Sequence, residues 1–361
     1  MRILIKTAFF MAISLFLRSP LIGQEIIHEI IPPQQLFRSN SAHFYIDNDV
    51  FSRLLTSRDR NYTMGVGFGY AHERLVDFPL IDVQQKALRA FWALSHPNGK
   101  EHAKRLEWLT PSLTLANKSF TPEDLAEEAP VFNDRPYGNV TLLESRVRLW
   151  DPAQNTSHAF TLSVGGLGLP MARETQILFH KIHQAFKEDS KAEIPEGWDN
   201  QISNPGELTF QIHYGRERYW YASKWVVNKK DVFVDLRESI DLYAGYQTNL
   251  SYALTGRMGW NENKHGSKRA RTWYGFVRAR PTIVAYDALL QGQFKESAYT
   301  LESTDINTFV GEFSAGMGVS WPWGKNRMHL LYGYYYRTPE ASFNGNSYAH
   351  TWGRFQLVYS F

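Results

Sequence analysis

The sequence predicts an all-β protein, a transmembrane antiparallel β-barrel of about twelve strands with one or two short helices. Three observations support this fold class. The chain begins like a secreted protein, and no later apolar run approaches the roughly 20 residues that a membrane helix needs. Aromatic residues make up 15% of the chain. Short segments alternate between large apolar residues and small or polar ones, which is typical of strands that face lipid on one side.

Residues 1–23 resemble a secretory signal peptide. Arg2 and Lys6 precede an apolar run that Arg18 closes, and Gly23 offers a small residue for cleavage. We expect residues 24–361 to form a single barrel domain after this segment is removed. Removal lowers Lys plus Arg from 39 to 36, equal to the 36 Asp plus Glu. A neutral chain gives no support to a nucleic-acid partner, and a chain without cysteine has neither disulfides nor thiolate metal ligands.

The clearest alternation lies in residues 62–71. One face carries Tyr62, Met64, Val66, Phe68 and Tyr70, and the other carries Thr63, Gly65, Gly67, Gly69 and Ala71. A soluble barrel packs its large apolar residues inward, whereas a membrane barrel turns them toward lipid. We therefore expect the aromatic face to meet lipid and Thr63 to face the interior.

The same pattern predicts eleven further strands. They are expected at residues 41–50, 106–117, 139–149, 158–165, 206–218, 239–249, 251–260, 272–286, 311–323, 327–337 and 350–361. An even number of strands suits a closed bacterial barrel. The last strand ends in Phe361, which resembles the signal that outer-membrane proteins present to their insertion machinery. A plainer interpretation is that this last strand pairs with the first strand and closes the barrel.

Two segments have helical spacing instead, residues 83–94 and 173–187. The second carries an apolar stripe on one side and Gln176, His180 and His183 on the other, where side chains four residues apart share a face. We expect this helix to fold into the lumen or to lie across the barrel mouth.

The polar residues of these segments suggest a hydrolytic site, although each alone has a plainer interpretation. Asn48 and Asp49 are typical of a turn, and His180 alone is typical of an amphipathic surface. Together, Gln176 and His180 place a base near its ordinary pKa of about 6.5 beside a second polar group. No G-x-S-x-G or H-E-x-x-H motif occurs. Water activated by histidine remains the simplest scheme, with an asparagine amide or a bound cation stabilising the oxyanion.

Four motifs in order then resemble one family. "NDVF…RDRNYTMGVGFGY", "NDRPYGNV", "GLGLP…ETQILFH" and "PEGWDNQI" are similar to the lipid A deacylase family of outer-membrane barrels, over about residues 44–214 and more weakly beyond. That resemblance implies a twelve-stranded barrel with its active site between the lumen and the outer leaflet. It also implies removal of the 3′-linked acyloxyacyl chain of lipid A.

The resemblance assigns roles to five residues. It implies that His180 activates water, that Asn48 and Thr63 orient the ester or its oxyanion, that Asp49 positions a calcium ion, and that Gln176 supports the site. Phe186 departs from the family where an acidic residue is expected, and no counterpart of a phosphate-binding Lys-Arg pair is found. Arg135, also within the shared motifs, is expected to shape a turn and a lumen hydrogen-bond network rather than to do chemistry, and Trp198 is expected to anchor the segment after the helix.

We therefore predict a carboxylic ester hydrolase of the bacterial outer membrane that acts on lipid A or lipopolysaccharide and works as a monomer. Two alternatives remain open at this point. One is an outer-membrane phospholipase that uses the same residues, and the other is a barrel that serves as a pore or structural protein.

Overall fold

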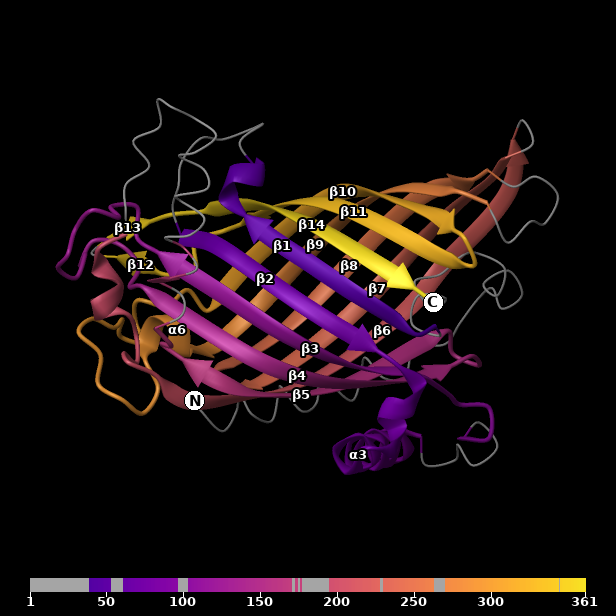
Figure 1. The fold of residues 1–361 in the computed structure, drawn as a ribbon, viewed down its shortest axis with the longest axis horizontal. Coiled ribbons are helices and arrows are strands. Elements are labelled where there is room, and N and C mark those ends of the chain that lie inside the picture. The colour runs from indigo at the N-terminus through magenta and orange to yellow at the C-terminus, as the bar shows by residue number, and fades with distance from the viewer. Residues whose placement is uncertain are drawn as a thin grey trace.

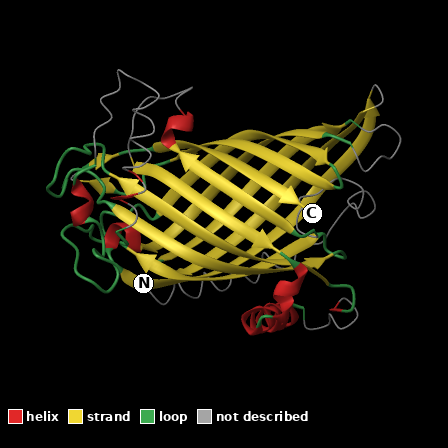
Figure 2. Ribbon diagram, in the orientation of Figure 1, coloured by secondary structure: helices red, strands yellow, loops and turns green. Residues whose placement is uncertain are grey.

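The computed structural model describes residues 39–52, 61–96, 103–170, 173, 174, 176, 195–227, 230–262, 270–343 and 345–361. Within these residues, twelve antiparallel strands form a closed barrel (Figures 1 and 2). In chain order they are β1 Ser41–Asn48, β2 Asn61–Ala71, β3 Glu107–Thr121, β4 Gly138–Asp151, β5 Thr156–Leu167, β6 Glu207–Val227, β7 Lys230–Gly245, β8 Gln247–Asn261, β9 Thr272–Asp287, β10 Phe309–Trp323, β11 Asn326–Arg337 and β14 His350–Ser360. Each pairs with its neighbour in sequence, and β14 closes the barrel by pairing with β1 and β11.

The predicted fold class is confirmed, and the predicted segments together reach all twelve strands of the barrel, although the segment 239–249 crosses the turn at Tyr246 from β7 into β8. The boundaries differ most at β6 and β7, which continue as a paired hairpin through Val227 and Lys230, well past the predicted segments. Two very short strands, β12 (Ser342–Phe343) and β13 (Asn346–Ser347), form a separate hairpin between β11 and β14. The expected signal peptide lies outside the described residues.

The glycines of β2 have a steric reason. A Cβ atom at Gly67 would lie 2.2 Å from the Tyr45 ring, and one at Gly69 would lie 1.9 Å from the His43 ring. Both rings belong to β1 and point into the lumen. On the opposite face of β2, Phe68 is 59% exposed, as a lipid-facing side chain should be. The predicted orientation of this strand is therefore confirmed for the glycine face and for Phe68.

The lumen is polar and contains ion pairs. A cavity of about 640 Å³ is lined by side chains of both charges. Arg354 of β14 makes two 2.6 Å hydrogen bonds to Asp47 of β1, across the seam that closes the barrel. These pairs compensate charges that would otherwise be costly to bury inside the wall.

One end of the lumen is crossed by an apolar layer. Leu289 belongs to the short helix α6 (Ala288–Gln291) and is 1% exposed. It packs in one cluster with side chains from β3, β4, β5, β14, α6 itself, the β5–β6 loop and the β7–β8 turn, namely Phe120, Val140, Leu142, Leu167, Ile202, Tyr246, Ala288 and Trp352. Figure 1 shows α6, β12 and β13 at this end of the barrel, away from the C-terminus. We call this end the distal rim and the end bearing Ser41 and Ser360 the terminal rim.

The predicted helix at 83–94 is confirmed as α3 (Pro79–Ser95), which follows the 3-10 turn η2 (Glu73–Asp77). It lies outside the barrel wall near the terminal rim (Figures 1 and 2). Among the described residues, no helix is both long and apolar enough to cross a bilayer.

Candidate active site

Asn48 and Asp49 form a turn at the distal rim, where β1 passes into the 3-10 turn η1 (Asp49–Ser52). The backbone N–H of Val50 donates to Asn48 Oδ1 at 2.8 Å and to Asp49 Oδ1 at 2.7 Å. Ser52 Oγ donates to the Asp49 carbonyl oxygen at 2.6 Å. The turn interpretation of this pair is thus correct, and it holds both side chains in fixed positions.

Asn48 is joined to the next strand at Thr63. The Asn48 amide donates to the Thr63 carbonyl oxygen at 2.9 Å, so two of the predicted site residues are in contact. The Thr63 hydroxyl lies 2.7 Å from the Thr121 hydroxyl of β3. Lys118 and Phe120 of β3 line the lumen, so Thr121 is on the outward face by alternation.

The expectation that Thr63 faces the interior is therefore wrong. The β2–β3 register shifts between Tyr62 and Met64, which places an irregularity at Thr63. Such a bulge interrupts the alternation from which the interior position was predicted. The Thr63 hydroxyl is directed toward an outward-facing partner instead.

A cluster of polar side chains continues along this outer face. We call it the outer rim patch, and it consists of Asn48, Thr63, Asn117, Ser119, Thr121, Asn139 and Thr141. Asn117 Nδ2 donates to Thr141 Oγ1 at 2.8 Å, and Asn139 Nδ2 donates to Ser119 Oγ at 3.0 Å. Ser119 Oγ donates in turn to Asn117 Oδ1 at 3.2 Å. Hydrogen bonds therefore connect the patch across β3 and β4.

The patch is unusual for the outside of a membrane barrel. Asn139 and Ser119 are fully buried, and the Asn139 Oδ1 atom has no hydrogen-bond partner within the described residues. Toward the terminal rim, the same face carries the exposed apolar side chains Leu115 and Leu143. The polar patch thus borders the lipid-facing belt at its distal edge, where hydrocarbon gives way to polar head groups.

Gln176 is held by a tryptophan near this edge. Trp198 Nε1, in the 3-10 turn η3 (Gly197–Asn200), donates to Gln176 Oε1 at 2.6 Å. The Trp198 ring packs at 4.9 Å from the Tyr137 ring, just before β4 begins and two residues from Asn139. Gln176 is 2% exposed, and its Nε2 has no hydrogen-bond partner within the described part of the chain. A buried donor left over in this way is available to a substrate oxygen.

His180, the predicted base, lies outside the described residues, as does most of the predicted helix at 173–187. Arg173, Glu174 and Gln176 are helical, in agreement with the start of that helix. The structure thus brings Asn48 and Thr63 together and places Gln176 near the same strand ends. No described contact joins Gln176 to Asn48 or Asp49, and the role of each predicted residue remains a proposal.

The side chains around Asp49 suit a hard cation by type, because carboxylate and amide oxygens are what Ca²⁺ prefers. The Asp49 carboxylate and the Asn48 amide oxygen both accept a hydrogen bond from the Val50 N–H, so their oxygen atoms lie close together. Three or more His, Asp or Glu side chains in a metal-binding arrangement do not occur among the described residues.

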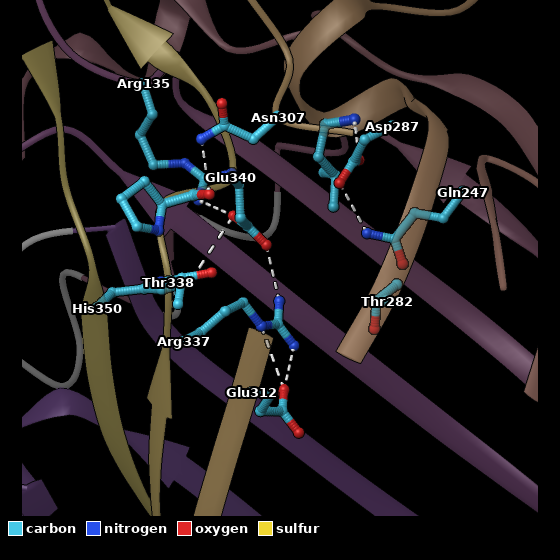
Figure 3. A network of polar contacts seen from close by, with 12 residues as sticks. Arg135, Gln247, Thr282, Asp287, Asn307, Glu312, Arg337, Thr338, Glu340 and His350 are labelled. Carbon is cyan, nitrogen blue, oxygen red and sulfur yellow. Dashed lines mark hydrogen bonds and ion pairs between the residues drawn. The ribbon is translucent and has the colours of Figure 1, made fainter. Parts of the chain in front are cut away.

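A network of charged side chains stabilises the distal rim (Figure 3). Arg135, from the loop between β3 and β4, is buried, stacks on Phe120 at 4.0 Å and lies 3.3 Å from Glu340. Arg337 pairs with Glu340 at 2.7 Å and with Glu312 at 2.6 Å. The expectation that Arg135 takes part in a lumen hydrogen-bond network is confirmed by its hydrogen bond to Glu340, which lines the lumen.

The pKa of Glu340 reflects this network. Burial alone would raise it, but the positive charges of Arg337 and Arg135 lower it by more and hold the pKa at about 2. Glu340 is therefore ionised at any physiological pH, and it ties together two loops of the distal rim.

Sequence reasoning did not identify Asn117, Ser119, Thr121, Asn139 or Thr141 as site residues. Polar residues on strands are expected in the lumen of a membrane barrel, so their polarity alone did not distinguish them from luminal ones. The available signal was the alternation of inward and outward positions along β3 and β4. Lys118 and Glu144 occupy the luminal positions, which leaves three consecutive alternate polar residues of β3 on the lipid-facing side.

Comparison with known proteins supports the fold and the family. Among solved structures, LpxR from Salmonella typhimurium has a TM-score of 0.60 at 16% identity, covering 89% of this chain and 100% of that one. The β domain of the Bordetella autotransporter BrkA reaches a TM-score of only 0.40 at 9% identity, covering 90% and 100% of the two chains. No curated protein sequence matches. The model of the family described as outer membrane protein LpxR matches residues 9–361, so the chain belongs to this family of outer membrane proteins.

Proposed function

We propose that this barrel is a carboxylic ester hydrolase that removes the 3′-linked acyloxyacyl chain of lipid A in the outer leaflet. The observation that carries the proposal is the outer rim patch, a partly buried polar cluster on the outward face at the edge of the lipid-facing belt. The ester bonds of a membrane lipid lie at this depth, between acyl chains and head group. The sequence motifs that resemble lipid A deacylases include Asn48, Thr63 and Asn139, and all three belong to the patch.

The proposal assigns a role to each predicted residue. His180 takes a proton from water, which attacks the ester carbonyl carbon and expels the alkoxide of the lipid. Asn48 and Thr63 orient the ester, and Gln176 supports the site. The buried Gln176 Nε2 donor suits an oxygen that gains negative charge in the transition state. The leaving alkoxide recovers the proton from His180.

The orientation of the barrel supports an outer-leaflet substrate. Outer-membrane barrels have short periplasmic turns and longer extracellular loops. At the distal rim the connections include residues 49–60, 122–137, 168–206, 288–308 and 338–349. At the terminal rim the connections are residues 72–106 with α3, residues 262–271, and the short turns 152–155, 228–229 and 324–325. We infer that the distal rim is extracellular and that the patch therefore meets the outer leaflet.

Calcium assistance is a further part of the proposal. Asp49, with the Asn48 amide oxygen beside it, would hold the cation through oxygen atoms. A bound Ca²⁺ would supply positive charge that polarises the ester carbonyl. The remaining ligands would come from water, the substrate or other oxygen atoms.

Activity on defined lipids tests the proposal. The purified barrel is incubated with lipid A and separately with phospholipid, with calcium or with a chelator, and released fatty acids are identified by mass spectrometry. We expect release from lipid A by the wild type and none by His180→Ala. Release from phospholipid alone would identify a phospholipase. Release that persists in the alanine variant would refute the assignment of the base, and no release from either lipid would favour a pore or structural protein.

A further inference from the structure

Helix α3 has two apolar faces, of which the barrel covers one. Ile81, Leu88 and Trp92 are buried in a cluster with Val147 and Leu149 of β4. Arg146 and Arg148 of the same strand line the lumen, so Val147 and Leu149 are on the outward face of the wall. The helix therefore packs against the side of the barrel that faces lipid.

The second apolar face is exposed. Leu80, Val83, Phe91 and Leu94 are 49%, 59%, 44% and 82% exposed. Successive helical residues turn by about 100°, which places these four together on one arc beside the packed stripe. The polar residues of the helix, Asp82, Gln85, Lys86 and Arg89, lie on the remaining arc. In aqueous solution an arc of four exposed apolar side chains would be unfavourable.

The direction of this apolar arc can be read from its neighbours. Gln84 lies between the packed stripe and the apolar arc, and it exchanges hydrogen bonds with Ser145, well inside β4. His96, just after the helix, contacts Gln154 in the turn at the terminal rim, 2.8 Å away. The apolar arc is thus on the side of the helix toward the middle of the barrel, and the polar arc is on the side toward the terminal rim.

The depth of the helix agrees with a membrane boundary. Trp260, Trp273 and Trp323 are exposed at the ends of their strands at the terminal rim, as expected of an interfacial aromatic girdle. The α3 helix packs on β4 close to its end at Asp151, near the same level. Figure 1 shows α3 nearly end-on while the barrel extends across the picture, so the helix runs crosswise to the barrel axis.

We propose that α3 is an interfacial helix that lies in the phospholipid leaflet at the terminal rim. Leu80, Val83, Phe91 and Leu94 insert between acyl chains and continue the lipid-facing belt, to which Phe91 is joined by a ring contact of 4.7 Å with Tyr214 of β6. Lys86 and Arg89 lie at the level of the lipid phosphates, where basic residues of amphipathic helices gain electrostatic attraction to anionic lipid. This proposal does not depend on the enzymatic one.

Site-directed spin labelling tests this placement, and the chain contains no cysteine that would interfere. Leu94→Cys carries a nitroxide on the apolar arc, and Ala93→Cys carries one on the adjacent polar arc, where it serves as the matched control. Both positions are exposed, so neither label should prevent folding. The labelled barrels are reconstituted into vesicles of phosphatidylethanolamine and phosphatidylglycerol. Collision rates with oxygen, which concentrates in hydrocarbon, and with a water-soluble nickel chelate are then measured.

We expect the ratio of oxygen to nickel collisions to be several-fold higher at Leu94→Cys than at Ala93→Cys. Equal access of nickel to both labels would show that the helix lies in water and would overturn the proposal. Exclusion of both reagents from the Leu94→Cys label would also overturn it, because a second copy or a partner protein, rather than lipid, would then cover the arc.

Discussion

Replacing Trp198 with phenylalanine tests how Gln176 is positioned. The indole N–H of Trp198 donates to Gln176 Oε1 at 2.6 Å, and the ring packs against Tyr137. Phenylalanine retains most of the packing and removes the donor. The Gln176 amide would then lose the hydrogen bond that holds its Oε1 toward Trp198 and its Nε2 away from Trp198.

The size of the effect follows from the burial of Gln176. Its side chain is 2% exposed, so the abandoned Oε1 atom cannot simply be hydrated by bulk water. A buried polar atom left without a partner costs about 1–3 kcal/mol. If this cost appears in the transition state, the rate falls roughly 5- to 150-fold, since each 1.36 kcal/mol corresponds to about tenfold.

The assay is the initial rate of fatty-acid release from lipid A, with folding checked by heat-modifiable gel mobility. Trp150→Phe is the matched control, because Trp150 and Trp198 are both 1% exposed but Trp150 lies at the terminal rim. We expect the control to retain wild-type activity. Full activity in folded Trp198→Phe would refute the positioning argument, and full activity in Gln176→Ala would remove Gln176 from the site altogether.

Three further predictions concern Thr63, Asp49 and the charged network around Glu340 at the distal rim. Thr63→Val removes the 2.7 Å contact with Thr121 and should lower kcat/KM roughly 2- to 10-fold, whereas Thr63→Ser should restore it; equal rates in both variants would contradict this. Asp49→Asn should weaken calcium binding and so raise the calcium concentration that gives half-maximal ester release. An unchanged concentration would show that Asp49 is not a ligand. The pKa of Glu340 is about 2, against an ordinary value of 4.5. Its ionised form therefore stabilises the fold above about pH 5, and this stabilisation is lost as the pH falls toward 2. The contribution is on the order of 3 kcal/mol, so the melting temperature of Glu340→Gln should be lower at pH 7 and depend less on acid than that of the wild type; parallel pH profiles would contradict the assignment.

Much of the barrel was predictable because lipid imposes a simple rule. Phe68 points outward, while Gly67 and Gly69 point inward, since the rings of Tyr45 and His43 need their space. The helix at α3 was predictable for a similar reason, because its apolar spacing is helical over its whole length.

The extensions of β6 and β7 were not predicted. The start of β7, residues 230–238, is charged like a solvated loop, whereas the end of β6, residues 219–227, carries a single charge, Lys224. In the structure, Asp235 of β7 pairs across the sheet with Arg257 of β8 at 2.7 Å, and Arg237 pairs with Glu217 of β6 at 3.1 Å. Cross-strand pairing makes charged segments suitable as strands, and a single-sequence pattern does not show which charges will face each other.

The candidate site was predicted in part. Asn48 and Thr63 were expected to act on the same ester and are in contact in the structure, but the predicted interior position of Thr63 was wrong because a local irregularity there interrupts the alternation. The contact between Gln176 and Trp198 joins residues that are distant in sequence, and local patterns carry no information about such contacts.

The central claim is that substrate reaches the site from the lipid side of the wall rather than through the lumen. Asn117 and Lys118 are consecutive residues of β3 on opposite faces, so Asn117→Cys and Lys118→Cys can each be blocked with the same bulky thiol reagent. The measurement is the rate of acyl release from lipid A before and after blocking. Our account predicts that the reagent stops release by Asn117→Cys and leaves Lys118→Cys active. Inhibition of Lys118→Cys alone would contradict it.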